Sequence, residues 1–241
     1  MHAPATQTIP AELLLMAYRA GVFPMADARD DPEVFWVEPR ERAVIPLDDF
    51  APSRSLKKVI RQGRFRVSCD EAFGEVIRAC AAPRADEDGG EAGSWISHRI
   101  EASYRQLHDI GHAHSVECWQ SGAEGEELVG GLYGVSFDRV FCGESMFTRA
   151  DNASKVALAW LVAAMRNAGF MVLDCQFMTG HLASLGARTI SQEDYVARIT
   201  AARGSADYSL PDSFASLLSA DAGGGGASPE KLIAQSFTQT S

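Results

Sequence analysis

Apolar residues are spaced so that they predict a regular series of helices and strands from about residue 50 onward. Within residues 73–80 they recur at the i, i+3, i+4, i+7 positions of one helix face, and within residues 64–69 they alternate with polar residues as in a strand. The predicted helices cover 11–20, the segment from Ser53 or Ser55 to Gln62, a segment capped by Asp70, a segment starting at Ser97, 152–168, 180–185 and a segment starting at the Ser191-x-x-Asp194 capping box. The predicted strands cover 64–69, 113–119, 127–136, 139–147, 170–177 and 187–190.

The order of these elements, β-α-α-β-β-β-α-β-α-β-α, predicts an α+β fold. It matches the succession of the GNAT-type acyltransferases, in which helices cover both faces of a mixed sheet, although element order does not establish chemistry. We expect a small loop-rich N-terminal module over 1–52, a GNAT-like domain over 53–205, and a C-terminal extension over 206–241. Gly223 to Gly226 indicate that this extension is largely flexible.

Two of the predicted strands carry polar groups inside apolar runs. Glu144 lies within residues 141–147, and Asp174 and Gln176 lie within residues 173–177. Alternation along a strand places Asp174 and Gln176 on one face and Cys175 on the other. A buried carboxylate is costly unless it is paired or hydrogen-bonded. Two interpretations remain open on these residues alone: a buried structural network, or a polar site for binding or catalysis.

The charge of the chain is unevenly distributed. Its formal net charge is −10, which argues against binding of polyanions by the whole surface. Residues 40–66, however, hold eight basic and three acidic residues, a local net charge of +5. This basic stretch is either a solvated helix face or a patch that contacts nucleic-acid phosphates. The residues on which the second interpretation rests are Arg54, Lys57, Lys58, Arg61 and Arg64.

Length and motif content suggest one large cytoplasmic domain without a cofactor. The chain has 241 residues, no apolar run near the roughly 20 residues that span a bilayer, and no signal-peptide pattern at its start. Its cysteines (Cys69, Cys80, Cys118, Cys142 and Cys175) lack metal-ligand spacing and are expected to be free thiols. His108, His112 and His114 lie near Cys118, but without a second cysteine or acid at ligand spacing we expect no metal site.

A set of short motifs, in this order along the chain, resembles the bacterial leucyl/phenylalanyl-tRNA–protein transferases. The resemblance covers about residues 11–200, and the motif set is specific as a whole although each motif alone is weak. The motifs occupy residues 18–24, 94–96, 107–117, 129–135, 141–147, 152–155, 173–176 and 183–187.

This resemblance implies a GNAT-like core fold and an aminoacyltransferase that uses charged tRNA as its donor. Enzymes of this family move Leu, Phe or Met onto the N-terminal α-amine of proteins that begin with Arg or Lys. The new N-terminus marks the acceptor protein for degradation. The implied partners are therefore charged tRNA and basic N-termini, with no membrane and no cofactor, and we expect a monomer.

The resemblance also assigns roles to individual residues. It implies a relay in which Asp174 orients Gln176, Gln176 accepts from the attacking amine, and Glu144 binds the amine or the basic first side chain. The positions that would form an apolar cup for the donor side chain, and that also fit plain core packing, are Leu132, Phe141, Met146, Leu158, Leu161 and Leu173. The positions that would stack on the terminal adenosine are Tyr18, Trp95 and Tyr104, and the basic stretch would grip the acceptor stem.

Three departures from the family pattern concern the donor side of the site. Met25 stands where better-known members have Trp, a loss that Trp36 could compensate; Thr179 stands where some have Asn. The N-terminal module is also shorter.

Two alternative functions remain: an acyl-CoA-dependent GNAT acyltransferase, which would need a Gly-rich loop that residues 148–152 lack, and a non-catalytic adaptor for basic N-termini.

Overall fold

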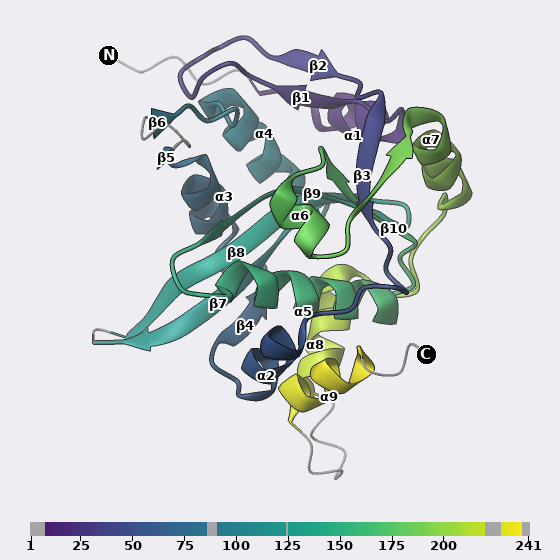
Figure 1. Cartoon of the computed structure of the whole chain (residues 1–241). Helices are drawn as coiled ribbons and strands as arrows, with labels where there is room; N and C mark the ends of the chain where they lie inside the picture. Colours follow the sequence, from purple (N-terminus) through teal and green to yellow (C-terminus); the bar gives the residue numbers. More distant parts are fainter. Residues whose placement is uncertain (1–7, 86–90, 124, 220–227, 238–241) are drawn as a thin grey trace.

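A computed structural model describes residues 8–85, 91–123, 125–219 and 228–237 of the chain (Figure 1). Its centre is a seven-stranded mixed sheet in the order β11-β3-β10-β9-β8-β7-β4. The strands of this sheet are β3 (Glu41–Ile45), β4 (Arg66–Cys69), β7 (Ala113–Gly122), β8 (Gly125–Phe137), β9 (Val140–Thr148), β10 (Val172–Gln176) and β11 (Arg188–Ser191). β9 and β10 run parallel, whereas the other neighbouring strands of this sheet are antiparallel.

Two short hairpins and a series of helices complete the described chain. The hairpins are β1 (Phe23–Met25) with β2 (Phe35–Val37), and β5 (Arg84–Ala85) with β6 (Glu91–Ala92). The helices are α1 (Ala11–Arg19), α2 (Arg54–Arg61), α3 (Phe73–Ala81), α4 (His98–Asp109), α5 (Ala153–Asn167), α6 (Gly180–Ser184), α7 (Gln192–Ala201), α8 (Leu210–Ser219) and α9 (Pro229–Ser236). None of the helices in the described ranges has the length and apolar character that a bilayer crossing requires.

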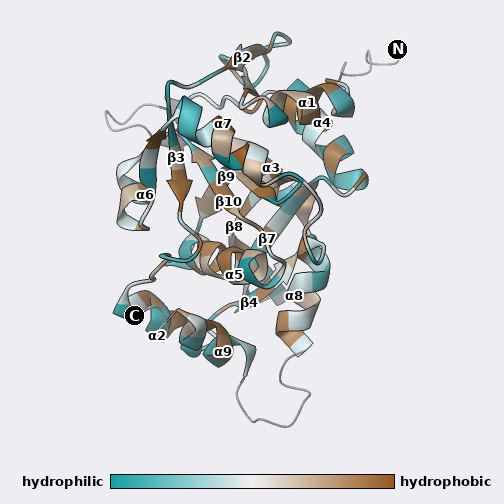
Figure 2. Cartoon of the chain, turned by 90° about the vertical axis from the view of Figure 1, so that its right-hand side faces the viewer, coloured by the Kyte–Doolittle hydropathy of each residue, from teal (hydrophilic) through white to brown (hydrophobic). Residues whose placement is uncertain are grey.

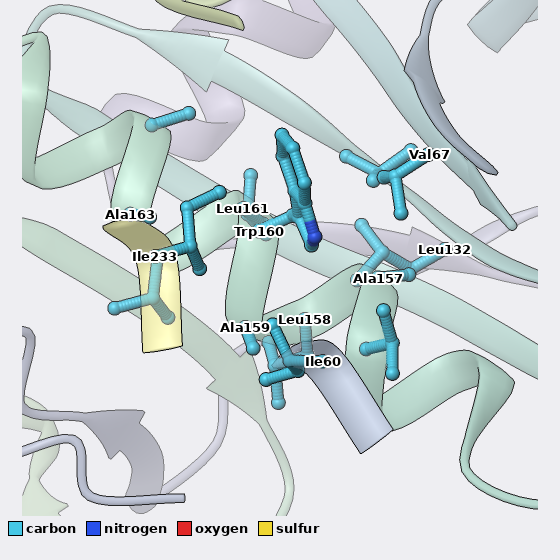
Figure 3. Packing of buried hydrophobic residues seen from close by; sticks show 14 of the residues in the cluster. Ile60, Val67, Leu132, Ala157, Leu158, Ala159, Trp160, Leu161, Ala163 and Ile233 are labelled. Carbon is cyan, nitrogen blue, oxygen red and sulfur yellow. The ribbon is translucent and has the colours of Figure 1, made fainter. Parts of the chain in front are cut away.

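Each face of the sheet carries its own hydrophobic core. On one face α5 lies against β7, β8 and β9 and is covered in turn by α2, α8 and α9 (Figures 1 and 2). Trp160, at the middle of α5, is 1 % exposed and lies among the residues of this core (Figure 3). Its ring stacks on Phe214 of α8. On the other face α1, α3, α4 and α7 bury a second cluster that includes Tyr104 and Tyr195. Because each face is covered, the residues of the central strands are mostly buried and apolar, with a few buried polar exceptions such as Glu144 and Asp174.

The local signals in the sequence predicted most of these elements and several of their ends. Ser53, Ser97 and Ser191 each accept a hydrogen bond from a backbone N–H in the first turn of α2, α4 and α7. The turn expected near Asp138 is present, with this residue at a φ of 52° between β8 and β9. Cap chemistry and turn chemistry are local, so they are readable without the tertiary structure.

Asp70 does not cap a helix, contrary to the prediction. α3 begins at Phe73, three residues after Asp70, and Asp70 has a φ of 61°. Its carboxylate instead accepts hydrogen bonds from the backbone N–H of Ser115 at 2.8 Å and from Nδ1 of His114 at 2.7 Å. The side chain therefore joins the end of β4 to β7. Its hydrogen-bond partners are His114 and Ser115, more than 40 positions away, rather than a backbone N–H of the following helix.

The two ends of the chain also differ from the expectation. β3, whose residues were assigned to the N-terminal module of 1–52, lies inside the main sheet between β10 and β11. The expectation of a largely flexible C-terminal extension was wrong for α8 and α9. These helices pack on the core around α5, where Phe214 and Phe237 are buried. Gly223 to Gly226 lie outside the described residues.

Candidate active site

A cavity of about 770 Å³ opens at the centre of the sheet, where β9 and β10 lie side by side. Its walls come from β1, β8, β9, β10, α5 and α6, together with the end of α3. The sequence predicted much of its apolar lining: the cavity is lined by Leu132, Met146, Leu158, Leu161 and Leu173. Phe141, the sixth residue expected in the donor cup, is fully buried and is not part of the lining.

Glu144 on β9 is the carboxylate in the wall of this cavity. It is only 7 % exposed and is surrounded by hydrogen-bond donors. Tyr18 Oη donates to its Oε1 at 2.8 Å, Tyr104 Oη to its Oε2 at 3.1 Å, and Gln176 Nε2 to its Oε1 at 2.7 Å. The two tyrosine hydroxyls are also 2.5 Å apart. Three elements distant in sequence, α1, α4 and β10, thus converge on one carboxylate.

The environment of Glu144 raises the pKa of its carboxyl group to about 7. Burial is the main cause, and the negative charge of Asp174 adds to it, while the hydrogen bonds from Tyr18 and Tyr104 act in the opposite direction. A carboxyl group that is half-ionised near neutral pH can take up or release a proton during a reaction at that pH. Glu144 therefore combines access to the cavity with the proton affinity expected of an acid–base group.

Asp174 on β10 is held in a second network behind this wall. Arg42 Nε donates to Asp174 Oδ1 at 2.9 Å and Arg42 Nη2 to Oδ2 at 2.6 Å, and both side chains are fully buried. Tyr195 Oη donates to Oδ2 at 3.1 Å. The Arg42 guanidinium lies over the ring of Tyr195 at 4.3 Å and donates to the carbonyl oxygen of Gly21 at 3.0 Å. This bidentate pair fixes the position of the Asp174 side chain.

A β-bulge connects the two networks. The register of β10 against β3 shifts between Asp174 and Gln176, and Gln176 has a φ of 59°. The backbone N–H of Gln176 donates to Asp174 Oδ1 at 2.8 Å, which holds the residue in this unusual conformation. The predicted alternation is confirmed in that Cys175 packs toward the α5 core, away from the partners of Asp174. Gln176 and Cys175 both line the cavity, whereas Asp174 does not.

Comparison with known proteins decides the family of this chain. The family model described as "Leucyl/phenylalanyl-tRNA protein transferase" matches residues 44–200, and the model of its N-terminal domain matches residues 8–40. The chain belongs to this transferase family. It is an aminoacyltransferase family, so the cavity is a candidate site for an aminoacyl group.

Individual relatives agree with the family model. A leucyl/phenylalanyl-tRNA–protein transferase of Novosphingobium aromaticivorans is 53 % identical, with 97 % of each chain covered. A transferase of the same name from Rhizorhabdus wittichii is 55 % identical over 82 % of this chain and 77 % of its own. The solved structure of L-PGS from Bacillus licheniformis is 14 % identical, covers 72 % of this chain and 55 % of its own, and has a TM-score of 0.37, a level that does not establish a shared fold.

The three aromatic residues expected to stack on the adenosine are placed differently from one another. Trp95 lines the cavity and is half-buried. Tyr18 and Tyr104 are fully buried, so neither ring has a free face for a base, and their hydroxyl groups serve Glu144 instead. This corrects the stacking assignment for the two tyrosines. Phe177, which the sequence did not single out, lines the cavity with 45 % of its surface exposed.

Both residues that depart from the transferase family pattern lie at the cavity. Met25 lines it from β1, whereas Trp36 is not among the lining residues. Thr179 lines it from the start of α6, where its Oγ1 accepts a hydrogen bond from the N–H of Leu182 at 3.1 Å. These positions therefore shape the cavity, and the oxygen of Thr179 is already engaged as a helix cap.

The basic stretch of residues 40–66 divides into buried and exposed groups. Arg42 belongs to the buried Asp174 network, and Arg66 forms ion pairs with Glu71 and Glu126. Lys57 Nζ donates to the carbonyl oxygen of Phe237 at 2.9 Å, which ties α2 to the end of α9. The exposed cations that remain on α2 and the loop after it are Arg54, Lys58, Arg61 and Arg64.

Besides Phe177, sequence reasoning missed Arg42 and Tyr195, which hold Asp174. The signal for Arg42 was present, because it precedes the apolar run 43–45 just as Glu144 and Asp174 interrupt theirs. It was counted instead with the basic stretch. Among the described residues no cluster of three or more metal-ligating side chains occurs, and the Nδ1 atoms of His108 and His112 hydrogen-bond backbone carbonyl oxygens.

Proposed function

We propose that this chain transfers Leu, Phe or Met from aminoacyl-tRNA to the N-terminal α-amine of proteins that begin with Arg or Lys. The product carries a new N-terminal residue that marks it for degradation. The observation that carries the proposal is the juxtaposition, in a member of this family, of an apolar cup with Glu144 and Gln176 in one cavity. Such a cup separates donors by only about 1–3 kcal/mol per methylene, which fits a broad choice of apolar donors.

The reaction is an attack of the acceptor amine on the aminoacyl ester. A C–N bond forms, the ester C–O bond breaks, and the 3′ oxygen of the tRNA leaves with a proton that originates on the amine. Since the ester is already activated, the protein has to position the two substrates and handle this proton.

The hydrogen bonds favour a division of roles among the three polar residues. Gln176 directs its Nε2 group to Glu144, so its Oε1 atom is the one that can accept from the attacking amine. Glu144, with its pKa raised to about 7, is suited to take up the proton. Asp174 does not reach the cavity and holds the Gln176 backbone, so we assign it as a positioning residue rather than a catalytic residue.

Trp95 and Phe177 are the accessible aromatic rings for the terminal adenosine, and the exposed cations of α2 support a contact with the acceptor stem. The parallel β9–β10 pair and the element order support a GNAT-like topology. A cytoplasmic monomer completes the proposal.

Transfer of radiolabelled leucine tests it directly. Purified protein is incubated with [14C]leucyl-tRNA and a peptide that begins with Arg, and acetyl-CoA is offered as the competing donor. We expect label in the Arg peptide, none in the same peptide with an acetylated N-terminus, and no acetyl transfer. Acetylation of the peptide without leucyl transfer would instead establish an acyl-CoA-dependent enzyme, and binding of the peptide without either reaction would establish an adaptor.

A further inference from the structure

Three basic residues in or beside the lining of the cavity form what we call its positive border: Arg149, Lys155 and His181. Arg149, which follows β9, and His181, on α6, both line the cavity. Lys155 lies in the first turn of α5, next to Ser154, which is also a lining residue. Glu144 is the carboxylate among these lining residues, and it is buried and hydrogen-bonded to Tyr18, Tyr104 and Gln176. On a chain of net charge −10, a cavity border of this kind is a local exception.

Arg149 is held in place by groups that leave most of its donors free. Its Nη1 donates to the carbonyl oxygen of Leu128 at 3.1 Å, and its guanidinium lies over the ring of Phe147 at 5.1 Å. Its backbone N–H donates to the carbonyl oxygen of Val129 at 2.7 Å. No ion pair is recorded for this arginine within the described part of the chain. An exposed, preorganised guanidinium with free N–H groups is suited to bind a phosphate oxygen pair.

Lys155 and His181 extend this positive border. The pKa of His181 is lowered by partial burial and by the positive charge of Lys155. Lys155 is half-buried and has no ion pair among the described residues; Asp151 is a nearby carboxylate in sequence, and it is exposed and also without a described ion pair. Lys155 belongs to α5 and His181 to α6, so the positive groups come from two different helices.

We propose that Arg149, Lys155 and His181 bind the phosphodiester that joins the terminal adenosine of the donor tRNA to the preceding nucleotide. This inference rests on the proposed function. Arg149 and His181 line the cavity that also holds Gln176 and Glu144, and Lys155 follows the lining residue Ser154, so these cations are available to the phosphate next to an ester bound in that cavity. An acceptor that begins with Arg or Lys would be repelled there, which leaves the polyanionic donor as the ligand whose charge fits.

Donors of graded length test the assignment. Leucyl-tRNA, a leucyl dinucleotide with one phosphodiester, and leucyl-adenosine with none are compared on the wild-type chain and on Arg149→Met. Methionine keeps an apolar stem against Phe147 but removes the guanidinium. We expect KM for the dinucleotide to rise about tenfold or more, the loss typical of one charge-assisted hydrogen bond, with KM for leucyl-adenosine unchanged. Lys155→Met is expected to act in the same direction.

Arg61→Met on α2 is the matched control, because it removes an exposed arginine outside the cavity and is expected to affect leucyl-tRNA alone. The assignment is overturned if Arg149→Met leaves KM for the dinucleotide at the wild-type value, if it raises KM for leucyl-adenosine equally, or if it changes KM for the acceptor peptide instead. If the wild-type chain transfers leucine from none of the three donors, the proposed function itself is overturned. This outcome differs from failure of the phosphate site alone, in which the wild-type chain still transfers leucine.

Discussion

Arg42 and Asp174, which are 132 positions apart in the chain, form a bidentate ion pair with both side chains fully buried. The pair joins β3 to β10, and the carbonyl oxygen of Gly21 extends it to the segment after α1. Through the Gln176 backbone it also sets the bulge that carries the amide into the cavity. One charge pair therefore links the N-terminal segment, the sheet and the proposed site.

Removal of either partner of this pair is expected to destabilise the fold strongly. Arg42→Met leaves the Asp174 carboxylate buried without a counter-ion, and Asp174→Ala leaves the Arg42 guanidinium in the same condition. Each is expected to lower the free energy of unfolding by about 3–5 kcal/mol, measured by urea unfolding. A loss of leucyl transfer in Asp174→Ala can therefore result from unfolding as well as from loss of the positioning role, so its free energy of unfolding is measured alongside its activity.

The double variant Arg42→Met, Asp174→Leu separates stability from positioning. It removes both charges, so it is expected to be more stable than either single variant, while leucyl transfer stays low because the Gln176 N–H no longer has its acceptor. Arg66→Met, which breaks exposed ion pairs, is the control and is expected to change stability by less than about 1 kcal/mol. Full transfer activity in the double variant would contradict the positioning role.

Gln176 is expected to respond differently to glycine and to alanine. Its φ of 59° favours glycine, so Gln176→Gly is expected to be more stable than Gln176→Ala by about 1 kcal/mol. Both variants lose the amide that donates to Glu144 and are expected to lose most of kcat for leucyl transfer. Equal stability of the two variants, compared by thermal unfolding, would argue against the strained bulge.

The raised pKa of Glu144 predicts a specific dependence of stability on pH. The ordinary pKa of this group is 4.5 and the folded value is about 7, so between these values the folded state holds a proton that the unfolded state has released. Stability then falls as pH rises through this range, by up to about 3 kcal/mol, and the loss is complete above pH 7.

Glu144→Gln lacks this titration. Urea unfolding of the wild-type chain and the variant at pH 4.5, 6 and 7.5 is therefore expected to show wild-type stability declining relative to the variant. A constant difference across these pH values would show that the pKa of Glu144 is close to ordinary in the folded protein. Leucyl transfer by the variant is expected to lose the dependence on an ionisation near pH 7.

The exposed cations of α2 are expected to contribute to tRNA binding through charge alone. Lys58→Glu with Arg61→Glu should raise KM for leucyl-tRNA and reduce its dependence on salt, with the logarithmic slope falling by about 1 for each phosphate that the variant no longer neutralises. Lys57 is left unchanged because it holds α9. A KM that does not change at any salt concentration would show that these residues are only a solvated helix face.

Most of the helices and strands of this protein, and three of the helix caps, could be predicted from the sequence because their causes are local. A serine before α2, α4 or α7 meets its N–H partner three residues away, and the apolar spacing of residues 73–80 follows from the helix repeat itself. The resemblance of the motifs to the transferase family likewise needed no coordinates. Five of the six residues that the resemblance assigned to the donor cup line the cavity.

The partners of the polar residues were decided only by the tertiary structure. Tyr18, Tyr104 and Gln176 reach Glu144 from 126, 40 and 32 positions away, and neither periodicity nor spacing encodes such a meeting. The same holds for Arg42, whose sequence neighbourhood suggested a basic surface while packing placed it beside Asp174. The sequence by itself determined which side chains are costly to bury. The fold decided which partners make that burial possible, because the cost of an isolated charge is met by contacts between segments that meet only when the sheet is assembled.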